Sequence, residues 1–128
     1  MSRQTILIVE DDPHLSVVMR VVLARAGYDV LVAGTKTSAE EQLATRTVDL
    51  IVLDIVLPDG SGLSVLEAIR ASGRTDPVLV VSGVADDMNR AAAEALGADG
   101  FLAKPFTGRD LIEHCESLRR DSPAAMMS

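Results

Sequence analysis

Side chains that can do chemistry come directly after four of the short apolar runs in this 128-residue sequence. In chain order they are Glu10, Asp11, Asp12, Asp54, Ser82 and Lys104. Parallel strands of an open α/β sheet present their carboxyl ends at one edge, where binding sites form. If the apolar runs are such strands, three to four acids, a hydroxyl and an ammonium group gather at that edge. We therefore expect a single polar site there.

The chemistry open to this set is phosphoryl transfer to a carboxylate. Crowded carboxylates repel one another unless a cation neutralises them, and an all-oxygen site suits Mg²⁺ better than zinc or copper. An Asp carboxylate can act as a nucleophile and become an aspartyl phosphate, a reaction that requires positioning and charge neutralisation. Asp54 is the better candidate for the nucleophile, because it stands alone after a fully apolar run. Asp11 and Asp12 are then left to hold the metal.

Five apolar runs alternate with stretches of helical periodicity. The runs cover residues 5–9, 29–32, 50–53, 78–81 and 101–103. Most are continuous rather than alternating, which is typical of strands that are covered on both faces, as in a parallel sheet. Right-handed crossovers between such strands put helices on both faces of the sheet. The sequence therefore predicts a doubly wound α/β fold of five βα units, (βα)5, with a five-stranded parallel sheet.

Capping signals mark where the helices begin and end. Asp12 followed by Pro13 predicts an N-cap and a first helical residue. Residues 37–40 form a capping-box pattern, and residues 107–110 form a similar pattern with Asp in place of Glu. Three glycines stand where helices are expected to end: Gly27, Gly73 and Gly97.

Composition excludes several classes of protein. The net charge of −7 disfavours binding to duplex DNA, and an aromatic content of 2% disfavours stacking on single strands. The sequence contains no apolar run long enough to cross a bilayer and no signal-peptide pattern. The single cysteine, Cys115, rules out an internal disulfide and is expected in the core. We expect a cytoplasmic protein with one domain over residues 1–121 and a tail or linker over residues 122–128.

The sequence resembles the receiver domains of bacterial two-component response regulators over roughly residues 4–120. The motifs that carry this resemblance are Ile8-Val9-Glu10-Asp11-Asp12, Asp54-Ile55-Val56-Leu57-Pro58 with Gly62, Val81-Ser82-Gly83, Gly97-Ala98 and Phe101-Leu102-Ala103-Lys104-Pro105-Phe106. Each motif alone is weak, but the set in this order and spacing is specific. The resemblance implies a flavodoxin-like (CheY-like) fold with strand order 2-1-3-4-5.

The resemblance also implies a role for each matching residue. Asp54 would accept a phosphoryl group from the phosphohistidine of a sensor histidine kinase or a phosphotransfer protein. Mg²⁺ would be held by Asp11, Asp12, Asp54 and the backbone carbonyl of Val56. Lys104, before a cis peptide bond to Pro105, would pair with the phosphoryl oxygens. Ser82 would hydrogen-bond the phosphoryl group, and Phe101 would be the rotameric switch residue. Phe101 departs from the family's frequent Tyr, so the hydroxyl is absent.

The implied function is a signalling switch that is not a turnover enzyme, and the sequence leaves its output open. The chain is a stand-alone receiver or the isolated receiver of a longer DNA-binding regulator, and phosphorylation-dependent homodimerisation through the switch face is a further possibility. A Mg²⁺-dependent phosphatase with an aspartyl-phosphate intermediate is the alternative from another class. The haloacid-dehalogenase-like enzymes of that class carry an Asp-x-Asp motif on their first strand, which this sequence lacks. A docking scaffold indifferent to phosphorylation is the third hypothesis.

Overall fold

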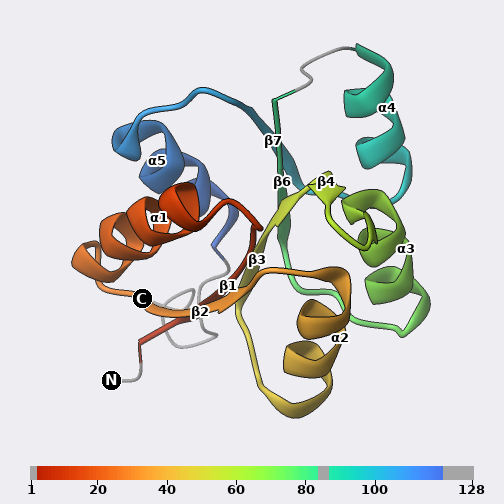
Figure 1. Ribbon diagram of the computed structural model, residues 1–128, viewed down its shortest axis with the longest axis horizontal. Coiled ribbons are helices and arrows are strands. Elements are labelled where there is room, and N and C mark those ends of the chain that lie inside the picture. The colour runs from red at the N-terminus through yellow and green to blue at the C-terminus, as the bar shows by residue number, and fades with distance from the viewer. Residues whose placement is uncertain (1–2, 84–86, 120–128) are drawn as a thin grey trace, which may run out of the picture.

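A five-stranded parallel sheet forms the centre of the computed structural model, which describes residues 3–83 and 87–119. Its strands are β1 (Thr5–Val9), β2 (Asp29–Ala33), β3 (Leu50–Asp54), β6 (Val78–Ser82) and β7 (Gly100–Ala103). They lie in the order β2-β1-β3-β6-β7, all parallel (Figure 1). The predicted five-stranded sheet with order 2-1-3-4-5 is confirmed. The predicted tail, residues 122–128, lies outside the described residues.

A small antiparallel hairpin follows β3 and was not predicted as strands. It consists of β4 (Val56–Leu57) and β5 (Gly60–Ser61), which form a separate two-stranded sheet. Two-residue strands carry no periodicity that a sequence pattern can show. The hairpin closes the segment between the predicted acceptor Asp54 and the next helix.

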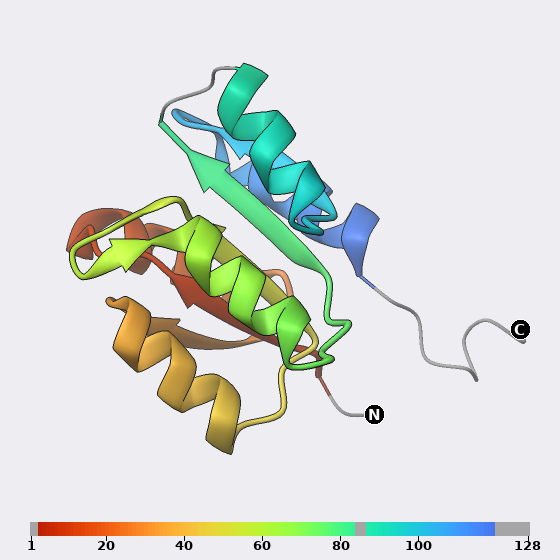
Figure 2. The ribbon, with the colours of Figure 1, turned by 90° about the vertical axis from the view of Figure 1, so that its right-hand side faces the viewer.

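Helices cover both faces of the sheet, as the doubly wound prediction requires. On one face lie α1 (Pro13–Arg25) and α5 (Gly108–Leu118). On the other face lie α2 (Lys36–Thr45), α3 (Gly62–Ala71) and α4 (Asp87–Ala95), side by side in Figure 2. Within residues 3–83 and 87–119, no helix has the length and apolar character needed to span a membrane.

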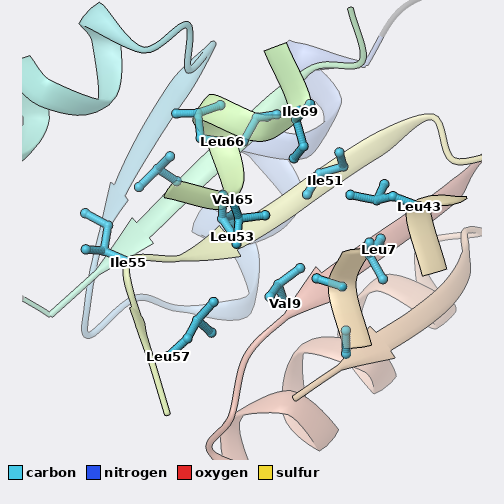
Figure 3. Close-up of a cluster of buried hydrophobic side chains, with 14 of the residues drawn as sticks. Leu7, Val9, Leu43, Ile51, Leu53, Ile55, Leu57, Val65, Leu66 and Ile69 are labelled. Carbon is cyan, nitrogen blue, oxygen red and sulfur yellow. The ribbon is translucent and has the colours of Figure 1, made fainter. Parts of the chain in front are cut away.

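Two hydrophobic cores lie on opposite faces of the sheet. One packs the sheet against α2, α3 and α4, and Figure 3 shows Val65, Leu66 and Ile69 of α3 close to Ile51 and Leu53 of β3. The other packs the sheet against α1 and α5 and contains the thiol of Cys115, which is buried as predicted. The central strands β3 and β6 are buried along their whole length. Burial of both faces is the reason why these runs are continuously apolar.

Two of the three predicted helix starts are confirmed, and one is wrong. Asp12 caps α1 ahead of Pro13, and residues 107 and 110 form the expected reciprocal capping box of α5. For α2 the N-cap is Thr35, so the predicted cap Thr37 lies inside the helix. The Asp59 carboxylate accepts hydrogen bonds from the amides of Lys36 (2.7 Å) and Thr37 (3.1 Å). Thr35 therefore caps the Ser38 amide locally, and the distant Asp59 satisfies the first two amides of the helix.

The predicted helix ends are borne out by the backbone. Gly27, Gly73 and Gly97 have φ of +103°, +88° and +98°, the left-handed region that glycine adopts without a steric penalty. They follow α1, α3 and α4 within two residues of the last helical position. The chain reverses at these points and returns to the amino edge of the sheet.

Candidate functional site

The chemistry-bearing side chains meet at the carboxyl edge of the sheet. Glu10 follows β1, Asp54 is the last residue of β3, Ser82 is the last residue of β6, and Lys104 follows β7. These four strands are neighbours in the order β1-β3-β6-β7. The parallel arrangement therefore brings together residues that lie up to 94 positions apart in the chain.

Lys104 bridges two buried carboxylates. Its Nζ lies 2.8 Å from Oε1 of Glu10 and 2.8 Å from Oδ2 of Asp54. Glu10 is 3% exposed and Asp54 is 5% exposed, whereas the Lys104 side chain is 24% exposed. A hydrogen-bonded ion pair with this much burial is screened from water far less than a surface pair. The ammonium is therefore the fixed counter-charge of the site.

The protonation states follow from burial and from these contacts. Burial raises the pKa of the Glu10 carboxyl, the negative charge of Asp54 raises it as well, and the hydrogen bonds from Lys104 and the Asp12 amide act against the shift. Burial alone would lower the pKa of Lys104, but its hydrogen bonds to Asp54 and Glu10 outweigh burial and raise it. Lys104 therefore stays an ammonium at neutral pH.

Three carboxylates are close enough to hold a metal ion. Ligand oxygens of Glu10, Asp11 and Asp54 lie within 4.8 Å of one another, and Asp11 is exposed while the other two are buried. Carboxylate oxygens are the ligands of hard divalent cations, and an exposed position leaves room for water. The donor set therefore fits Mg²⁺ better than a metal that prefers nitrogen or sulfur.

Asp12 caps α1 as predicted, and its predicted role as a metal ligand stays a prediction. Its Oδ1 accepts from the amides of His14 (2.9 Å) and Leu15 (3.2 Å), so its carboxylate caps α1. Its own amide donates to Oε2 of Glu10 (3.1 Å). The structure thus brings Asp11 and Asp54 together with Glu10, a residue that was not assigned to the metal. The position of Glu10, directly after β1, was the signal that would have found it.

The backbone around Asp54 is arranged by the hairpin and by α3. The amide of Val56 donates to Oδ1 of Asp54 (3.1 Å), and the amide of Gly62 donates to the Ile55 carbonyl (2.6 Å). A Cβ on Gly62 would overlap the carbonyl oxygen of Asp54, so only glycine lets α3 begin this close to the acceptor strand. The Val56 side chain is 63% exposed beside the site.

Ser82 and Phe101 lie on the strands at the other side of Asp54. Ser82 is 1% exposed and pairs with Ala103, and its carbonyl accepts from the amide of Lys104 (2.8 Å). The peptide bond between Lys104 and Pro105 is cis, as the family resemblance implied. Phe101 is half-buried and packs at the edge of the core under α3 and α4.

Comparison with known proteins identifies the family. Residues 6–116 match the family model described as the response regulator receiver domain. The chain belongs to this family. The match covers every strand of the central sheet except the first residue of β1, and it includes all of the candidate site residues.

Curated relatives of this receiver domain are regulatory proteins. Regulatory protein VanRB of Enterococcus faecalis is 37% identical over 119 residues, which are 93% of this chain and 54% of VanRB. The DNA-binding response regulator MtrA of Mycolicibacterium smegmatis is 33% identical over an alignment of 129 positions, which covers 98% of this chain and 56% of MtrA. The receiver domain thus spans about half the length of these relatives.

Solved receiver structures share the fold. A CheY-like response regulator receiver domain protein from Methanospirillum hungatei superposes with a TM-score of 0.86 at 30% identity, covering 91% of this chain and 93% of that chain. The BeF3-activated N-terminal receiver domain of Klebsiella pneumoniae RstA superposes with a TM-score of 0.87 at 27% identity, covering 92% of this chain and all of that chain.

Proposed function

We propose that Asp54 accepts a phosphoryl group from the phosphohistidine of a sensor histidine kinase or a phosphotransfer protein, and that the receiver then changes conformation to control an output. One observation carries this proposal. The Asp54 carboxylate ends a buried central strand, and its Oδ2 lies 2.8 Å from the Lys104 ammonium. Phosphoryl transfer is catalysed by positioning and by charge stabilisation, and this pair supplies both.

The transfer exchanges one bond for another. The bond between phosphorus and the histidine nitrogen breaks as a bond between phosphorus and an Asp54 carboxylate oxygen forms, and the imidazole nitrogen keeps the electron pair. The incoming phosphoryl oxygens bring negative charge to a place that already holds Glu10, Asp11 and Asp54. The Lys104 ammonium would pair with the phosphoryl oxygens, because it already lies 2.8 Å from Oδ2 of Asp54.

Magnesium is the metal that we assign to the acidic group. Glu10, Asp11 and Asp54 are the residues whose oxygens lie close enough together to hold it. When bound, Mg²⁺ neutralises charge on the carboxylates and on the phosphoryl oxygens. The predicted contributions of Asp12 and of the Val56 carbonyl stay predictions. Both capping hydrogen bonds of Asp12 go to Oδ1, so its Oδ2 can turn to a metal ion while the cap of α1 is kept.

Ser82 and Phe101 are proposed to report the phosphorylated state. Ser82 ends β6 next to β3, so its hydroxyl can reach a phosphoryl group on Asp54 after a small shift of the strand end. Phe101 lies on β7, beside β6. A two-state packing element of this kind responds to a local change in charge.

The partner that delivers the phosphoryl group would meet the receiver at α1. Val17, Val18 and Val21 on this helix are 49%, 55% and 37% exposed, an unusual group of apolar side chains on the surface. A hollow of about 490 Å³ next to them is lined by Asp12, His14, Leu15, Val18, Lys104, Pro105 and Phe106. Because Lys104 belongs to both the hollow and the site, a docked partner would lie beside the acceptor.

The output is proposed to be signalling in the cytoplasm, without enzymatic turnover. The curated relatives are named as regulators, and MtrA is named as a DNA-binding response regulator. They extend well beyond the matched part, so control of DNA binding in a longer protein is one output. Control of a separate partner protein and phosphorylation-dependent homodimerisation are two further outputs. The net charge of −7 argues against direct DNA binding by the receiver itself.

Intact mass spectrometry after incubation with acetyl phosphate and Mg²⁺ tests the proposal. We expect a gain of one phosphoryl group that is absent without Mg²⁺ and absent in Asp54→Asn. Asp29→Asn is the matched control, because Asp29 is an exposed aspartate at the opposite end of the strands.

Three outcomes would contradict the proposal. A phosphoryl gain in Asp54→Asn would place the acceptor elsewhere. Continuous release of phosphate from a phosphomonoester would favour the phosphatase. No gain even from a phosphorylated kinase, with unchanged partner binding in Asp54→Asn, would favour the scaffold.

A further inference from the structure

The two halves of α4 are held in different ways. At the C-terminal end, Arg70 of α3 donates through Nε (3.1 Å) and Nη2 (2.8 Å) to the Gly97 carbonyl, and through Nη2 to the Asp99 carboxylate (2.9 Å). Ala93 is the residue of α4 that is buried. An alanine methyl buries little apolar surface, so it holds the helix weakly. Residues 87–90 in the N-terminal half of α4 are exposed or only partly buried, so this half depends on the individual contacts of its side chains.

Arg90 in this N-terminal half lies over the ring of Phe101. Its guanidinium carbon is 5.4 Å from the ring centroid, within the distance at which a cation is attracted to an aromatic face. Glu94, one turn further along α4, places Oε1 3.8 Å from Nε of Arg90 and helps to orient the guanidinium. This contact joins α4 to β7.

Phe101 in turn shares a face of the sheet with Ser82. Phe101 pairs with Val80, and Ser82 pairs with Ala103, two residues further along both strands. Alternate residues of a strand point to the same face, so Ser82 and Phe101 lie on the face that α4 covers. Ser82 is the nearer of the two to the edge that holds Asp54. The Phe101 ring thus lies on the same face of the sheet as Ser82, with Arg90 of α4 over it.

We propose that Arg90 is a positioning residue whose guanidinium holds the Phe101 ring in its half-buried rotamer, so that the ring leaves this position only when the N-terminal half of α4 also moves. A phenyl ring has no hydroxyl with which to anchor itself. The attraction to the guanidinium exists for the half-buried rotamer and is lost in rotamers that turn the ring away from α4. The contact itself is independent of phosphorylation, and only its coupling to Asp54 rests on the proposed function.

NMR on the unphosphorylated full chain with ¹³C-labelled phenylalanine tests the contact directly. The chain has two phenylalanines, and Phe106 packs against the other core, so it serves as an internal reference. Arg90→Met removes the charge and keeps the length of the side chain. We expect the population of alternative Phe101 rotamers to rise by about two- to fivefold, the size of an exposed cation–π contact. Arg90→Lys should have a smaller effect.

Arg109→Met is the matched control. Arg109 is also an exposed helical arginine with a glutamate four residues further on, and its Nε lies 3.9 Å from Oε1 of Glu113. It should leave the Phe101 signals unchanged. Unchanged Phe101 signals in Arg90→Met, or an equal change in Arg109→Met, would overturn the proposal.

Titration with beryllofluoride and Mg²⁺ separates the contact from the proposed function. Beryllofluoride mimics a phosphoryl group on an aspartate. We expect half-conversion of the Phe101 signals at a concentration about two- to fivefold lower in Arg90→Met than in the unaltered chain. Equal concentrations in both proteins would overturn the coupling. If Phe101 responds to Arg90→Met but beryllofluoride changes neither protein, the contact stands and the proposed function fails.

Discussion

Both edges of the central sheet carry carboxylates and cationic side chains, but the balance between the two charges differs. At the carboxyl edge, Lys104 faces the carboxylates of Glu10 and Asp54, and Asp11 lies within 4.8 Å of both acids. This edge therefore has more negative than positive charge. Like charges in a partly buried site repel one another, and the pKa of Glu10 is raised by burial and by its neighbour Asp54.

At the amino edge two arginines, Arg70 and Arg74, are each paired with a carboxylate. Arg70 donates to the carbonyls of Gly97, Asp76 and Arg74 and pairs with the Asp99 carboxylate. Asp99 Oδ2 also accepts from the amide of Val78, at the start of β6. The arginine thus satisfies carbonyls at the end of α4 and in the loop before β6.

A second arginine repeats this arrangement at the amino edge. Arg74 pairs with the Asp76 carboxylate (2.7 Å) and donates to the Leu43 carbonyl at the end of α2 (2.9 Å). The comparison indicates that an excess of carboxylates over cations marks the functional edge. Arginines that are fully paired with carboxylates and carbonyls mark contacts that stabilise the fold. Substitutions at the two edges should therefore separate activity from stability.

The largest effect is expected from Lys104→Met. Loss of the ammonium leaves the transferred charge without its counter-charge, so phosphorylation from acetyl phosphate should slow by roughly 10²–10³-fold, as for the loss of one preorganised charge-stabilising group. The rate of mass gain measures this. Lys104→Arg keeps the charge but changes its shape, and it should recover only part of the rate. An unchanged phosphorylation rate in Lys104→Met would show that phosphorylation does not take place at the carboxyl edge.

Arg70→Met should have the opposite profile. It leaves carbonyls of Gly97, Asp76 and Arg74 without their donor, and the free energy of unfolding should fall by about 2–3 kcal/mol, as for the loss of charge-assisted hydrogen bonds to partly buried groups. Urea unfolding followed by circular dichroism measures the loss. Arg109→Met, at an 86% exposed side chain, should change it by less than about 0.5 kcal/mol. A phosphorylation rate reduced as strongly as in Lys104→Met would break the distinction between the edges.

Mg²⁺ should stabilise the carboxyl edge specifically. At a free Mg²⁺ concentration roughly ten times its Kd, binding adds about 1.4 kcal/mol to the free energy of unfolding. Asp11→Asn should reduce this gain and, without Mg²⁺, should itself stabilise the fold slightly because one repelling charge is gone. Thermal unfolding with and without Mg²⁺, against NaCl at equal ionic strength, measures both effects. An equal Mg²⁺ gain in Asp11→Asn would exclude Asp11 as a ligand.

The smallest effect concerns Asp59, which joins the hairpin to α2. The hydrogen bond from the Lys36 amide, with those from Thr37, lowers the pKa of its carboxyl below the ordinary 3.8. A lowered pKa in the folded state gives stability that is present above pH 3.8 and is lost as the pH falls through the folded pKa. Asp59→Asn should therefore unfold more easily near neutral pH and show a weaker loss of stability on acidification.

Urea midpoints at about pH 6 and about pH 3 check this prediction, because the two values bracket the ordinary range of a carboxyl. Asp29→Asn serves as the control for removing an exposed aspartate outside the hairpin. If both variants have the same dependence on pH, the Asp59 carboxylate does not cap α2 in solution.

The sequence predicted the sheet and the place of the site well, because both follow from short patterns. The run at residues 50–53 is apolar at every position, which indicates a strand covered on both faces, and the polar residue that follows it must lie at the carboxyl edge. The same argument placed Ser82 and Lys104. It placed Glu10 there too, but it did not show that Glu10 is an acid that Lys104 contacts.

Side-chain contacts between segments far apart in the chain could not be predicted from the sequence. Arg70 looks like any helical arginine until Gly97 and Asp99, 27 and 29 residues away, are folded against it. The start of α2 was placed two residues late: Thr35 caps it, and the amides of Lys36 and Thr37 are bound by Asp59, more than 20 residues further along the chain. Asp12 and Glu10 were distinguished only by their contacts in the fold, because Asp12 caps α1 and Glu10 accepts from Lys104.

The sequence by itself determined the five strands, the helices on both faces and the edge at which the acids and the lysine meet. These features depend on periodicity and on the fact that parallel strands share an edge, and both are local properties repeated along the chain. Only the tertiary structure decided which acids stand within reach of Lys104, which carboxylates cap helices, and that Arg90 lies over Phe101. The reason is that a side chain's partner is set by distances across the fold, and local patterns contain no such distances.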